Sequence, residues 1–270
     1  MSTKKMEREM HLMRHEAKYV IPRSMMPEII KFIEPFCELD SHCRGIPPEY
    51  EIRTLQLDAP NMALHFAKEN EAINRFKLRV RTYGDDMKAP VFLEIKQNVQ
   101  GVTRKERASL AASKWGKRLF DATVQNIHFR TDREEVCFLN FSRLVKEIGA
   151  RPVVIIRYIR TSYFGAFDHY ARVTFDRDMS YLPTTSWTLW PEAPKWITMD
   201  STNAQNKQFP FSGMVLELKS LCDAPQWMVE LVKHFGLERT GHCKYSNAIW
   251  NESLFRGTPP AHFYPDQAVS

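Results

Sequence analysis

The segment of this chain with the clearest chemical potential is a run of alternating cations. Between Arg75 and Arg81 the chain reads Arg-Phe-Lys-Leu-Arg-Val-Arg. Successive side chains of a strand point to opposite faces, and neighbours on one face lie about 6.5–7 Å apart. The four cations therefore repel one another unless an anion or solvent lies against them. The pattern predicts either an anion-binding surface or an exposed edge strand whose charges discourage pairing with another chain.

Three other segments have the same design. Arg14, Glu16 and Lys18 alternate near the start, Glu94 and Lys96 alternate after the basic run, and Glu217 and Lys219 alternate near the end. The positions between the charges are apolar: Ala17, Tyr19, Phe76, Leu78, Val80, Leu93, Ile95, Leu216 and Leu218. We expect an α+β fold in which these strands close into an antiparallel β-barrel, with a charged interior and helices packed outside. A charged interior is costly without a ligand.

A surface lined by many cations and few carboxylates suits a substrate with several adjacent negative charges, and phosphate chains fit best. Arginine makes paired contacts to phosphate oxygens, and lysine adds a mobile point charge. The interspersed carboxylates of Glu16, Glu94 and Glu217 have two interpretations. They could hold Mg²⁺ or Mn²⁺ on phosphates, which needs only one or two protein carboxylates, or form internal salt bridges with neighbouring cations. Phosphoryl transfer relies mostly on positioning and charge neutralisation, so the lack of a catalytic triad is expected.

The composition excludes several classes of protein. The chain has 270 residues, is 43% hydrophobic and has a net charge of +6, which favours one large domain and disfavours a broad coat for nucleic acid. It has no apolar run of 18 residues and no signal peptide at its start, so we expect a soluble, cytoplasmic protein without a membrane span. Its five cysteines are scattered without C-x-x-C spacing, which supports neither a disulfide frame nor a zinc site.

Periodicity and turn residues predict the elements that position these residues. We expect strands at 10–21, 50–58, 75–81, 91–97, 102–110, 153–164 and 170–178 and around Glu217. Helices are expected from Ser24 as the cap to Pro35, and at 60–68, 113–123, 132–148 and 225–235. In the helix at 132–148 the apolar positions include Val136 and Leu139. Residues 1–250 are interpreted as a single domain with an irregular, Trp- and Pro-rich insertion at about 180–211, and residues 251–270 as a mobile tail.

Eight short motifs in order resemble a known family. They are Arg-x-Glu-x-Lys-Tyr at 14–19, Arg-Val-Arg-Thr-Tyr-Gly at 79–84, Phe-Leu-Glu-Ile-Lys at 92–96, Thr-Arg-Lys-Glu-Arg at 103–107, Tyr-x-Arg at 158–160, Arg-Val-Thr-Phe-Asp at 172–176, Leu-Glu-Leu-Lys at 216–219 and Lys-Tyr-Ser at 244–246. This series resembles the VTC-type polyphosphate polymerase domain of the triphosphate tunnel metalloenzymes, the CYTH-like superfamily, here in a stand-alone form. The resemblance implies a tunnel barrel that binds triphosphate with Mn²⁺ or Mg²⁺. It also implies transfer of the terminal phosphoryl group of ATP to a polyphosphate chain.

By motif position the resemblance assigns roles to individual residues. The phosphate-binding and catalytic role falls to Lys18, Arg79, Arg81, Lys96, Arg160, Arg172 and Lys244, and the metal-ligand role to Glu217. Arg14, Lys77, Lys105, Arg107 and Lys219 are expected as second-line substrate-binding residues, and Glu16 and Glu94 as further candidate metal ligands. Two positions depart from the family's pattern. Arg14 stands where the wider superfamily has an acidic residue, and Asn98 stands where polymerase members often have a histidine.

Three functions remain open at the level of sequence. The first is a metal-dependent phosphotransferase that makes polyphosphate from ATP. The second is a tripolyphosphatase or nucleoside triphosphatase, which differs only in using water as the acceptor and needs a group to activate it. The third is a non-catalytic module that binds polyphosphate. The expected partners are ATP and inorganic polyphosphate or tripolyphosphate. Nucleic acid is not expected, because Phe76, the aromatic residue of the basic strand, lies on the face opposite the cations.

Overall fold

The computed structural model describes residues 15–100, 102–120, 127–167, 170–199, 213–221 and 223–257. These residues form two compact units. The first contains residues 15–51, 158–179 and 213–243, and the second contains residues 52–157, 180–199 and 244–257. The chain passes between the units within two long strands, β7 (Arg151–Gly165) and β8 (Arg172–Pro183). Arg14 and the other residues before His15 lie outside the described part of the chain.

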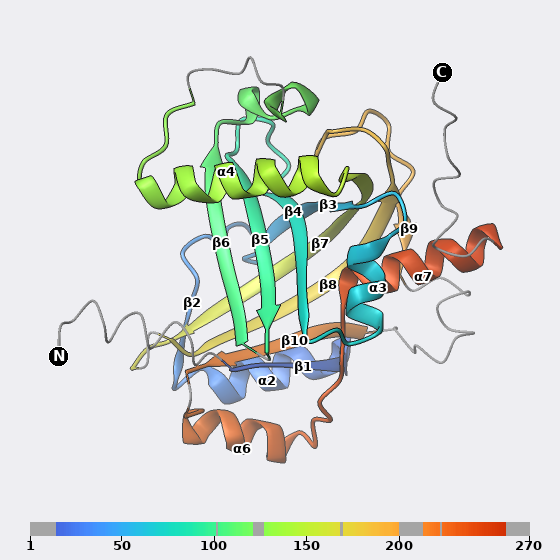
Figure 1. Ribbon diagram of the computed structural model, residues 1–270. Helices are drawn as coiled ribbons and strands as arrows, with labels where there is room; N and C mark the ends of the chain where they lie inside the picture. Colours follow the sequence, from blue (N-terminus) through green and yellow to red (C-terminus); the bar gives the residue numbers. More distant parts are fainter. Residues whose placement is uncertain are drawn as a thin grey trace. The chain divides into compact units, whose positions relative to one another are not determined.

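The first unit is an antiparallel sheet with helices on its apolar face. Its strands are hydrogen-bonded in the order β1 (His15–Pro22), β10 (Gly213–Ser220), β8 and β7, and β2 (Cys37–Leu39) pairs with the end of β7. A 3-10 turn, η1 (Arg23–Met25), leads into α2 (Met26–Ile33), and α6 (Gln226–His234) follows β10 (Figure 1). Ile29 of α2 and Leu231 of α6 are buried with Tyr19, Leu216 and Phe175 of the sheet. Alternation along the strands therefore separates an apolar face, covered by helices, from a charged one.

One glycine is required where β1 and β10 meet. Gly213 lies opposite Pro22 in the strand register. A Cβ atom at Gly213 would lie 2.2 Å from the carbonyl oxygen of Ile21, much closer than any side chain tolerates. Glycine thus permits the backbone approach that begins the β1–β10 ladder.

The second unit continues the sheet with a meander. Its hydrogen-bonded order is β8, β7, β3 (Tyr50–Asp58), β4 (Asn74–Tyr83), β5 (Val91–Val99) and β6 (Val102–Leu110), and the short β9 (Ile197–Thr198) pairs with β8. The ladders from β3 to β6 are antiparallel. The sequence-based predictions for the strands from β3 to β6 are confirmed to within a few residues. Antiparallel pairing suits strands with one apolar and one polar face.

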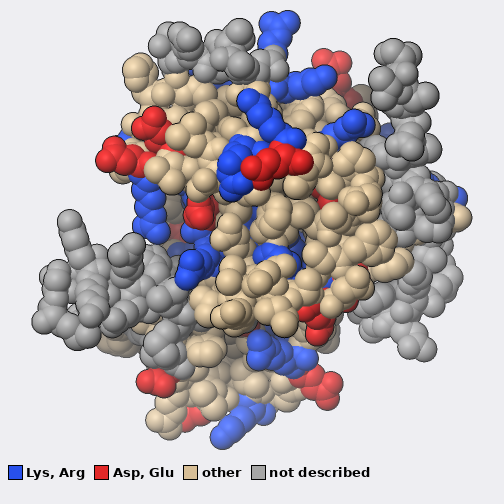
Figure 2. Space-filling model, viewed as in Figure 1, with Lys and Arg blue, Asp and Glu red and all other residues tan. Residues whose placement is uncertain are grey.

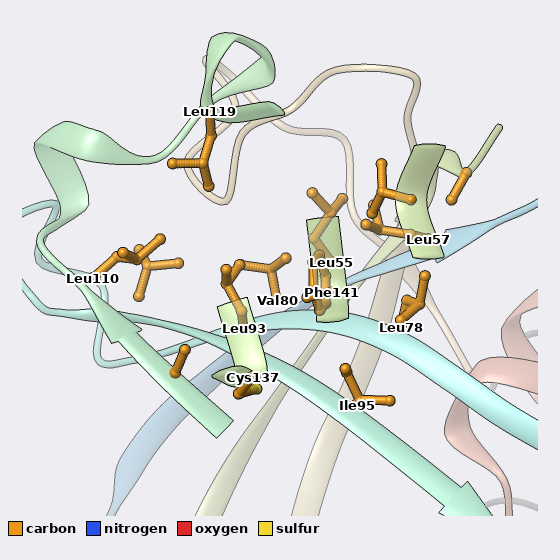
Figure 3. Packing of buried hydrophobic residues seen from close by; sticks show 14 of the residues in the cluster. Leu55, Leu57, Leu78, Val80, Leu93, Ile95, Leu110, Leu119, Cys137 and Phe141 are labelled. Atoms are coloured by element: carbon orange, nitrogen blue, oxygen red, sulfur yellow. The ribbon is translucent and has the colours of Figure 1, made fainter. Parts of the chain in front are cut away.

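The core of the second unit lies between this meander and α4 (Asp132–Glu147), which crosses β5 and β6 (Figure 1). Cys137 and Phe141 of α4 are buried against Val80, Leu93 and Ile95 of the strands (Figure 3). The helix begins at Thr131, whose side-chain oxygen accepts a hydrogen bond from the backbone N–H of Glu134 at 3.3 Å, as N-cap residues do.

The predicted apolar face of α4 is partly wrong. Val136 and Leu139 are exposed, at 54% and 58%, whereas Cys137, Phe141 and Val145 are buried. Positions 137, 141 and 145 follow the i, i+4 spacing of one helix face, and this face contains a cysteine that the sequence-based prediction did not count as apolar.

Other elements differ from the prediction at their ends. Two short 3-10 turns, η2 (Ala112–Lys114) and η3 (Lys117–Phe120), replace the described part of the helix expected at 113–123. Ser24 does not cap α2, since its N-cap is Met25 without a side-chain hydrogen bond. The helix expected at 60–68 is α3 (Ala63–Glu69). Helix α7 (Lys244–Arg256) extends into the segment expected to be a tail, and residues 258–270 lie outside the described residues.

The segment rich in tryptophan is partly ordered strand. β8 continues to Pro183, and β9 pairs with it through Tyr181 and Ile197. Trp187, Trp190 and Trp196 are partly buried against the core of the second unit. These tryptophans therefore pack as core residues, and residues 200–212 lie outside the described part.

The predicted closure of the barrel is wrong for the described strands. The hydrogen-bonded order is an open path that ends at β1 and β6, and no pairing joins these two strands among the described residues. Strand β6 carries exposed Thr103, Arg104 and Lys105 in succession. Exposed charges of this kind discourage a further strand from adding to a sheet edge. The protein is thus an open, mostly antiparallel sheet with helices.

Candidate phosphate-binding site

Each unit presents one charged sheet face, and each face is organised around a buried glutamate. We call the polar face of β4, β5 and β6 the Glu94 face and the polar face of β1, β10 and β8 the Glu217 face. Both follow from the alternation in sequence, because opposite residues of an antiparallel ladder point to the same side of the sheet.

The register of the Glu94 face places like charges side by side. Arg79 lies opposite Glu94, and Glu94 lies opposite Arg107. One step along the strands, Lys77 lies opposite Lys96, and Lys96 lies opposite Lys105. Like charges directly opposite one another destabilise a sheet. This lysine row, Lys77–Lys96–Lys105, is a costly arrangement that an anion would relieve.

Glu94 is the centre of an ion-pair cluster. One carboxylate oxygen accepts from Lys105 Nζ at 2.7 Å and from Arg107 Nε at 3.0 Å. The other accepts from Arg79 Nε at 2.7 Å and lies 4.0 Å from Arg81 Nη1. The Glu94 side chain is fully buried, at 0% exposure. Burial alone would raise the pKa of this carboxyl, yet Arg81, Arg79 and Lys105 hold it well below its usual range.

The cations around Glu94 retain access to solvent, which a ligand needs. The Lys105 side chain is 42% exposed. The pKa of Lys105 is lowered to about 8. Burial and the nearby cations Arg79 and Arg81 lower this pKa, and Glu94 opposes them. The charge of Lys105 therefore changes close to neutral pH. Four cations share one carboxylate, so the cluster carries excess positive charge.

Two aromatic residues hold Arg107. Its guanidinium lies 3.9 Å from the centre of the Phe92 ring and donates from Nη2 to the Tyr83 hydroxyl at 2.6 Å. Burial would raise the pKa of Tyr83, but Arg81 and Arg107 lower it to about 8. Phe92 shares the strand face of Glu94, and no role for Tyr83 was predicted from the sequence. The signal was present, because Tyr83 continues the alternation of Arg79 and Arg81.

The Glu217 face has a similar arrangement. Lys18 lies opposite Glu217 and Glu16 opposite Lys219 in the β1–β10 ladder. Lys219 Nζ, Arg160 Nη2 and Lys18 Nζ lie 3.4, 3.4 and 3.8 Å from Glu217 carboxylate oxygens. Burial would raise the pKa of Glu217, but Lys219, a hydrogen bond with Glu16, and the cations Lys18 and Arg160 hold it well below the ordinary value.

A second carboxylate fixes Arg160. Its Nε and Nη2 donate to the two oxygens of Asp176 at 2.6 and 2.7 Å, a bidentate pair that is almost fully buried. Arg172 lies 4.1 Å from the Phe164 ring centre, and Lys18 also donates to the His242 carbonyl at 3.3 Å. The sequence-based analysis gave Asp176 no role, although it follows Arg172 and Thr174 at the same parity. Asp176 thus orients Arg160 from a fully buried position.

Lys244 is positioned by a different contact. It is the first residue of α7, and the next residue, Tyr245, donates its hydroxyl proton to Asp58 at 2.6 Å. Asp58 also accepts from the backbone N–H groups of Ala59, Leu64 and His65. Asp58 thus ties the start of α7 to β3 and α3, a link that the Lys-Tyr-Ser motif alone does not reveal.

The carboxylates differ in how well they suit a divalent cation. Glu94 accepts from Lys105, Arg107 and Arg79, and Arg81 lies 4.0 Å away, so a metal ion at this carboxylate would meet four cations. Glu217 and Glu16 lie on neighbouring strands, and Lys18 and Lys219 each lie within 4 Å of both carboxylates. The Thr174 hydroxyl donates to Glu217 at 3.4 Å. Carboxylate oxygens on neighbouring strands are the ligand type that Mg²⁺ and Mn²⁺ prefer. No group of three or more acidic, histidine or cysteine ligands occurs among the described residues.

Buried carboxylates surrounded by arginine and lysine, on a face with surplus cations, are the type of site that binds phosphate groups. On the face of the molecule shown in Figure 2, cations and carboxylates are interspersed at the surface. Residues 13–251 match the family model described as the VTC domain, and the chain belongs to this family, whose domain is of the triphosphate tunnel type. The family is linked to polyphosphate metabolism.

Other comparisons are more distant. No curated protein matches the chain. Among solved structures, the PH1819 protein from Pyrococcus horikoshii OT3 is similar, with 13% identity and a TM-score of 0.43 over 88% of this chain and 99% of that chain. Within the described part of the chain, no helix has both the length and the apolar character needed to cross a membrane.

Proposed function

We propose that this protein is a metal-dependent phosphotransferase that binds ATP and polyphosphate and transfers the terminal phosphoryl group of ATP to a phosphate chain. The observation that carries the proposal is the lysine row beside the Glu94 cluster, where eight charged residues of three strands lie on one face and only one is acidic. The charge surplus matches a chain of phosphates, which has about one negative charge per unit.

In this proposal the cations bind and neutralise the phosphates. Arg79 and Arg107 are fixed by Glu94, and Arg160 is fixed by Asp176, so their guanidinium groups are already oriented before a ligand arrives. Preorganised cations stabilise negative charge on the transferred phosphoryl oxygens without further rearrangement.

Glu217 and Glu16 would hold Mg²⁺ or Mn²⁺, and the ion would neutralise phosphate charge and polarise the transferred group. Glu217 itself is kept ionised by Lys219, Lys18 and Arg160. Glu94 has a different role, because it orients cations and is not placed to bind a metal ion.

Incubation with labelled ATP and Mn²⁺ or Mg²⁺, with the products resolved on a denaturing gel, tests the proposal. A ladder of phosphate chains is the expected result. Free phosphate alone would instead identify a hydrolase in the same site. If the protein binds tripolyphosphate but does not turn over ATP, the proposed enzymatic activity is contradicted. The protein would then be a module that binds polyphosphate without catalysis. Glu147→Gln serves as a control variant for carboxylate removal, since Glu147 pairs with Arg143 on the exposed side of α4.

A further inference from the structure

The second unit contains a cleft that none of the residues of the Glu94 face lines. Its volume is about 1220 Å³, and its walls come from η3, the end of α4, the start of β7, the segment after β8 and α7. Small-molecule sites usually measure about 300–1,000 Å³. The cleft, which we call the Trp187 cleft, is therefore large enough for a nucleotide or a short phosphate chain.

The charged lining of the Trp187 cleft is mostly cationic. Four cations, Lys117, Lys146, Arg151 and Arg256, and a single carboxylate, Glu252, line it. Arg256 Nε donates to Glu252, so this pair is neutral. Within the described residues, the other three cations make no ion pair or side-chain hydrogen bond, and all three are exposed. Three unpaired cations therefore remain in one cleft.

The turn between α4 and β7 fixes two of these cations. Gly149 adopts a left-handed conformation at φ +60, its N–H donates to the Lys146 carbonyl at 3.3 Å, and the Ala150 N–H donates to the Val145 carbonyl at 2.8 Å. This arrangement ends the helix as a C-terminal αL cap does. The turn joins two lining residues, Lys146 and Arg151, and satisfies carbonyls that would otherwise repel an anion.

The lining of the Trp187 cleft also offers hydroxyl groups. Thr184, Thr185 and Ser186 line the cleft, and the Ser186 N–H donates to Thr184 Oγ1 at 3.0 Å. Beside them, the Trp187 ring lies 5.1 Å from the Phe120 ring, centre to centre. This wall is therefore held by packing, and its hydroxyls can donate hydrogen bonds to anionic oxygens.

We propose that the Trp187 cleft is a second ligand site, which binds a compact, multiply charged phosphate compound. Arginine and lysine in its lining match phosphate oxygens, and the three lining cations without a partner among the described residues exceed what a monoanion would neutralise. Inorganic tripolyphosphate and nucleoside triphosphates share this chemistry. The site does not depend on the proposed phosphotransfer, because its residues belong to neither charged face.

Local hydrogen–deuterium exchange, measured by mass spectrometry on the full chain, tests this site. Tripolyphosphate and ATP are the two probes. We expect each probe that binds to slow exchange in peptides covering 117–120 and 183–187. The triple variant K117A/K146A/R151A should need at least about tenfold more probe for half-maximal protection, because three charge contacts are lost. Higher ionic strength should weaken protection as well.

Two controls keep the result interpretable. R118A/R130A/R133A removes three exposed arginines of the same unit that do not line the cleft, and it should keep the wild-type half-saturation. The charge-conserving K117R/K146R variant should also reach half-maximal protection at the wild-type probe concentration. Protection by both probes assigns binding to the phosphate groups, and protection by ATP alone assigns an organic phosphate. The proposal is overturned if the triple variant needs no more probe than wild type for half-maximal protection. It is also overturned if neither probe, at about 10 mM, slows exchange in these peptides.

This readout is separate from the labelled-ATP assay. Failure of phosphotransfer would leave cleft protection in place, and loss of cleft protection would leave the gel ladder in place. The two proposals can therefore fail independently.

Discussion

Replacement of Glu94 by glutamine removes the charge that organises the Glu94 face and keeps the size of the side chain. In the wild-type protein four cations lie within 4.0 Å of this carboxylate, which is fully buried. After Glu94→Gln these cations face one another without a counter-charge. Glutamine also adds two N–H donors beside groups that are themselves donors only.

The size of the effect follows from burial. Two charges about 3 Å apart interact by roughly 5 kcal/mol at an effective dielectric constant of 20, before the cost of desolvation. Removing one partner of a buried ion pair costs about 3–5 kcal/mol. Lys105 and Arg107 are partly exposed, at 42% and 36%, and solvent will screen part of the repulsion that they feel. We therefore expect Glu94→Gln to lower the free energy of unfolding by about 3 kcal/mol.

Urea denaturation at pH 7 measures this loss, and Glu147→Gln is the matched control. Glu147 is 51% exposed and pairs with Arg143 one helical turn away, so its loss should cost only about 0.3–0.5 kcal/mol. The pKa of Glu94 lies below its ordinary value, so its stabilisation is fully present above the unfolded pKa of about 4.3 and is lost only as the pH falls further towards the folded pKa. Tripolyphosphate should raise the unfolding midpoint of Glu94→Gln more than that of wild type, because it supplies the missing negative charge. A loss below about 1 kcal/mol, equal to that of a surface pair, would refute the reasoning.

Three further predictions concern the site. Glu217→Gln should abolish turnover of labelled ATP and change tripolyphosphate affinity by less than about threefold, and unchanged turnover would remove the metal-ligand role. Polyphosphate affinity should fall between pH 7 and pH 9, because Lys105 loses its proton and Tyr83 gains a negative charge with pKa values of about 8. The double variant K105R/Y83F should flatten this profile, and a flat wild-type profile would contradict the assignment. Tyr245→Phe should lower unfolding free energy by about 1–2 kcal/mol in urea melts, because Asp58 loses a buried donor; an unchanged midpoint would show that this hydrogen bond does not hold α7.

Local alternation allowed most of the charged faces to be predicted from sequence. A period of two places Arg79, Arg81, Glu94 and Lys96 on one side of their strands whatever the distant chain does. The short turn between β5 and β6 then fixes the register that sets Arg107 opposite Glu94. Helices on the apolar face follow from the same pattern.

The features that sequence reasoning missed depend on contacts between distant residues. Barrel closure requires pairing of β1 with β6, and no local pattern reports whether two strand edges meet. The bidentate pair of Arg160 and Asp176 depends on the register of β7 against β8. The role of Glu94 depends on how many cations converge on it from the two neighbouring strands, which a single strand cannot show.

Tripolyphosphate binding by R79A/R81A, measured by calorimetric titration, tests the central claim most directly. The measurement is made in the K117A/K146A/R151A background, so that the Trp187 cleft does not contribute, and R118A/R133A in the same background is the matched control. We expect R79A/R81A to weaken tripolyphosphate affinity at least about tenfold, since two preorganised arginines are lost, and the control to leave it unchanged. An equal affinity in R79A/R81A and the control would show that the Glu94 face does not bind the phosphate chain.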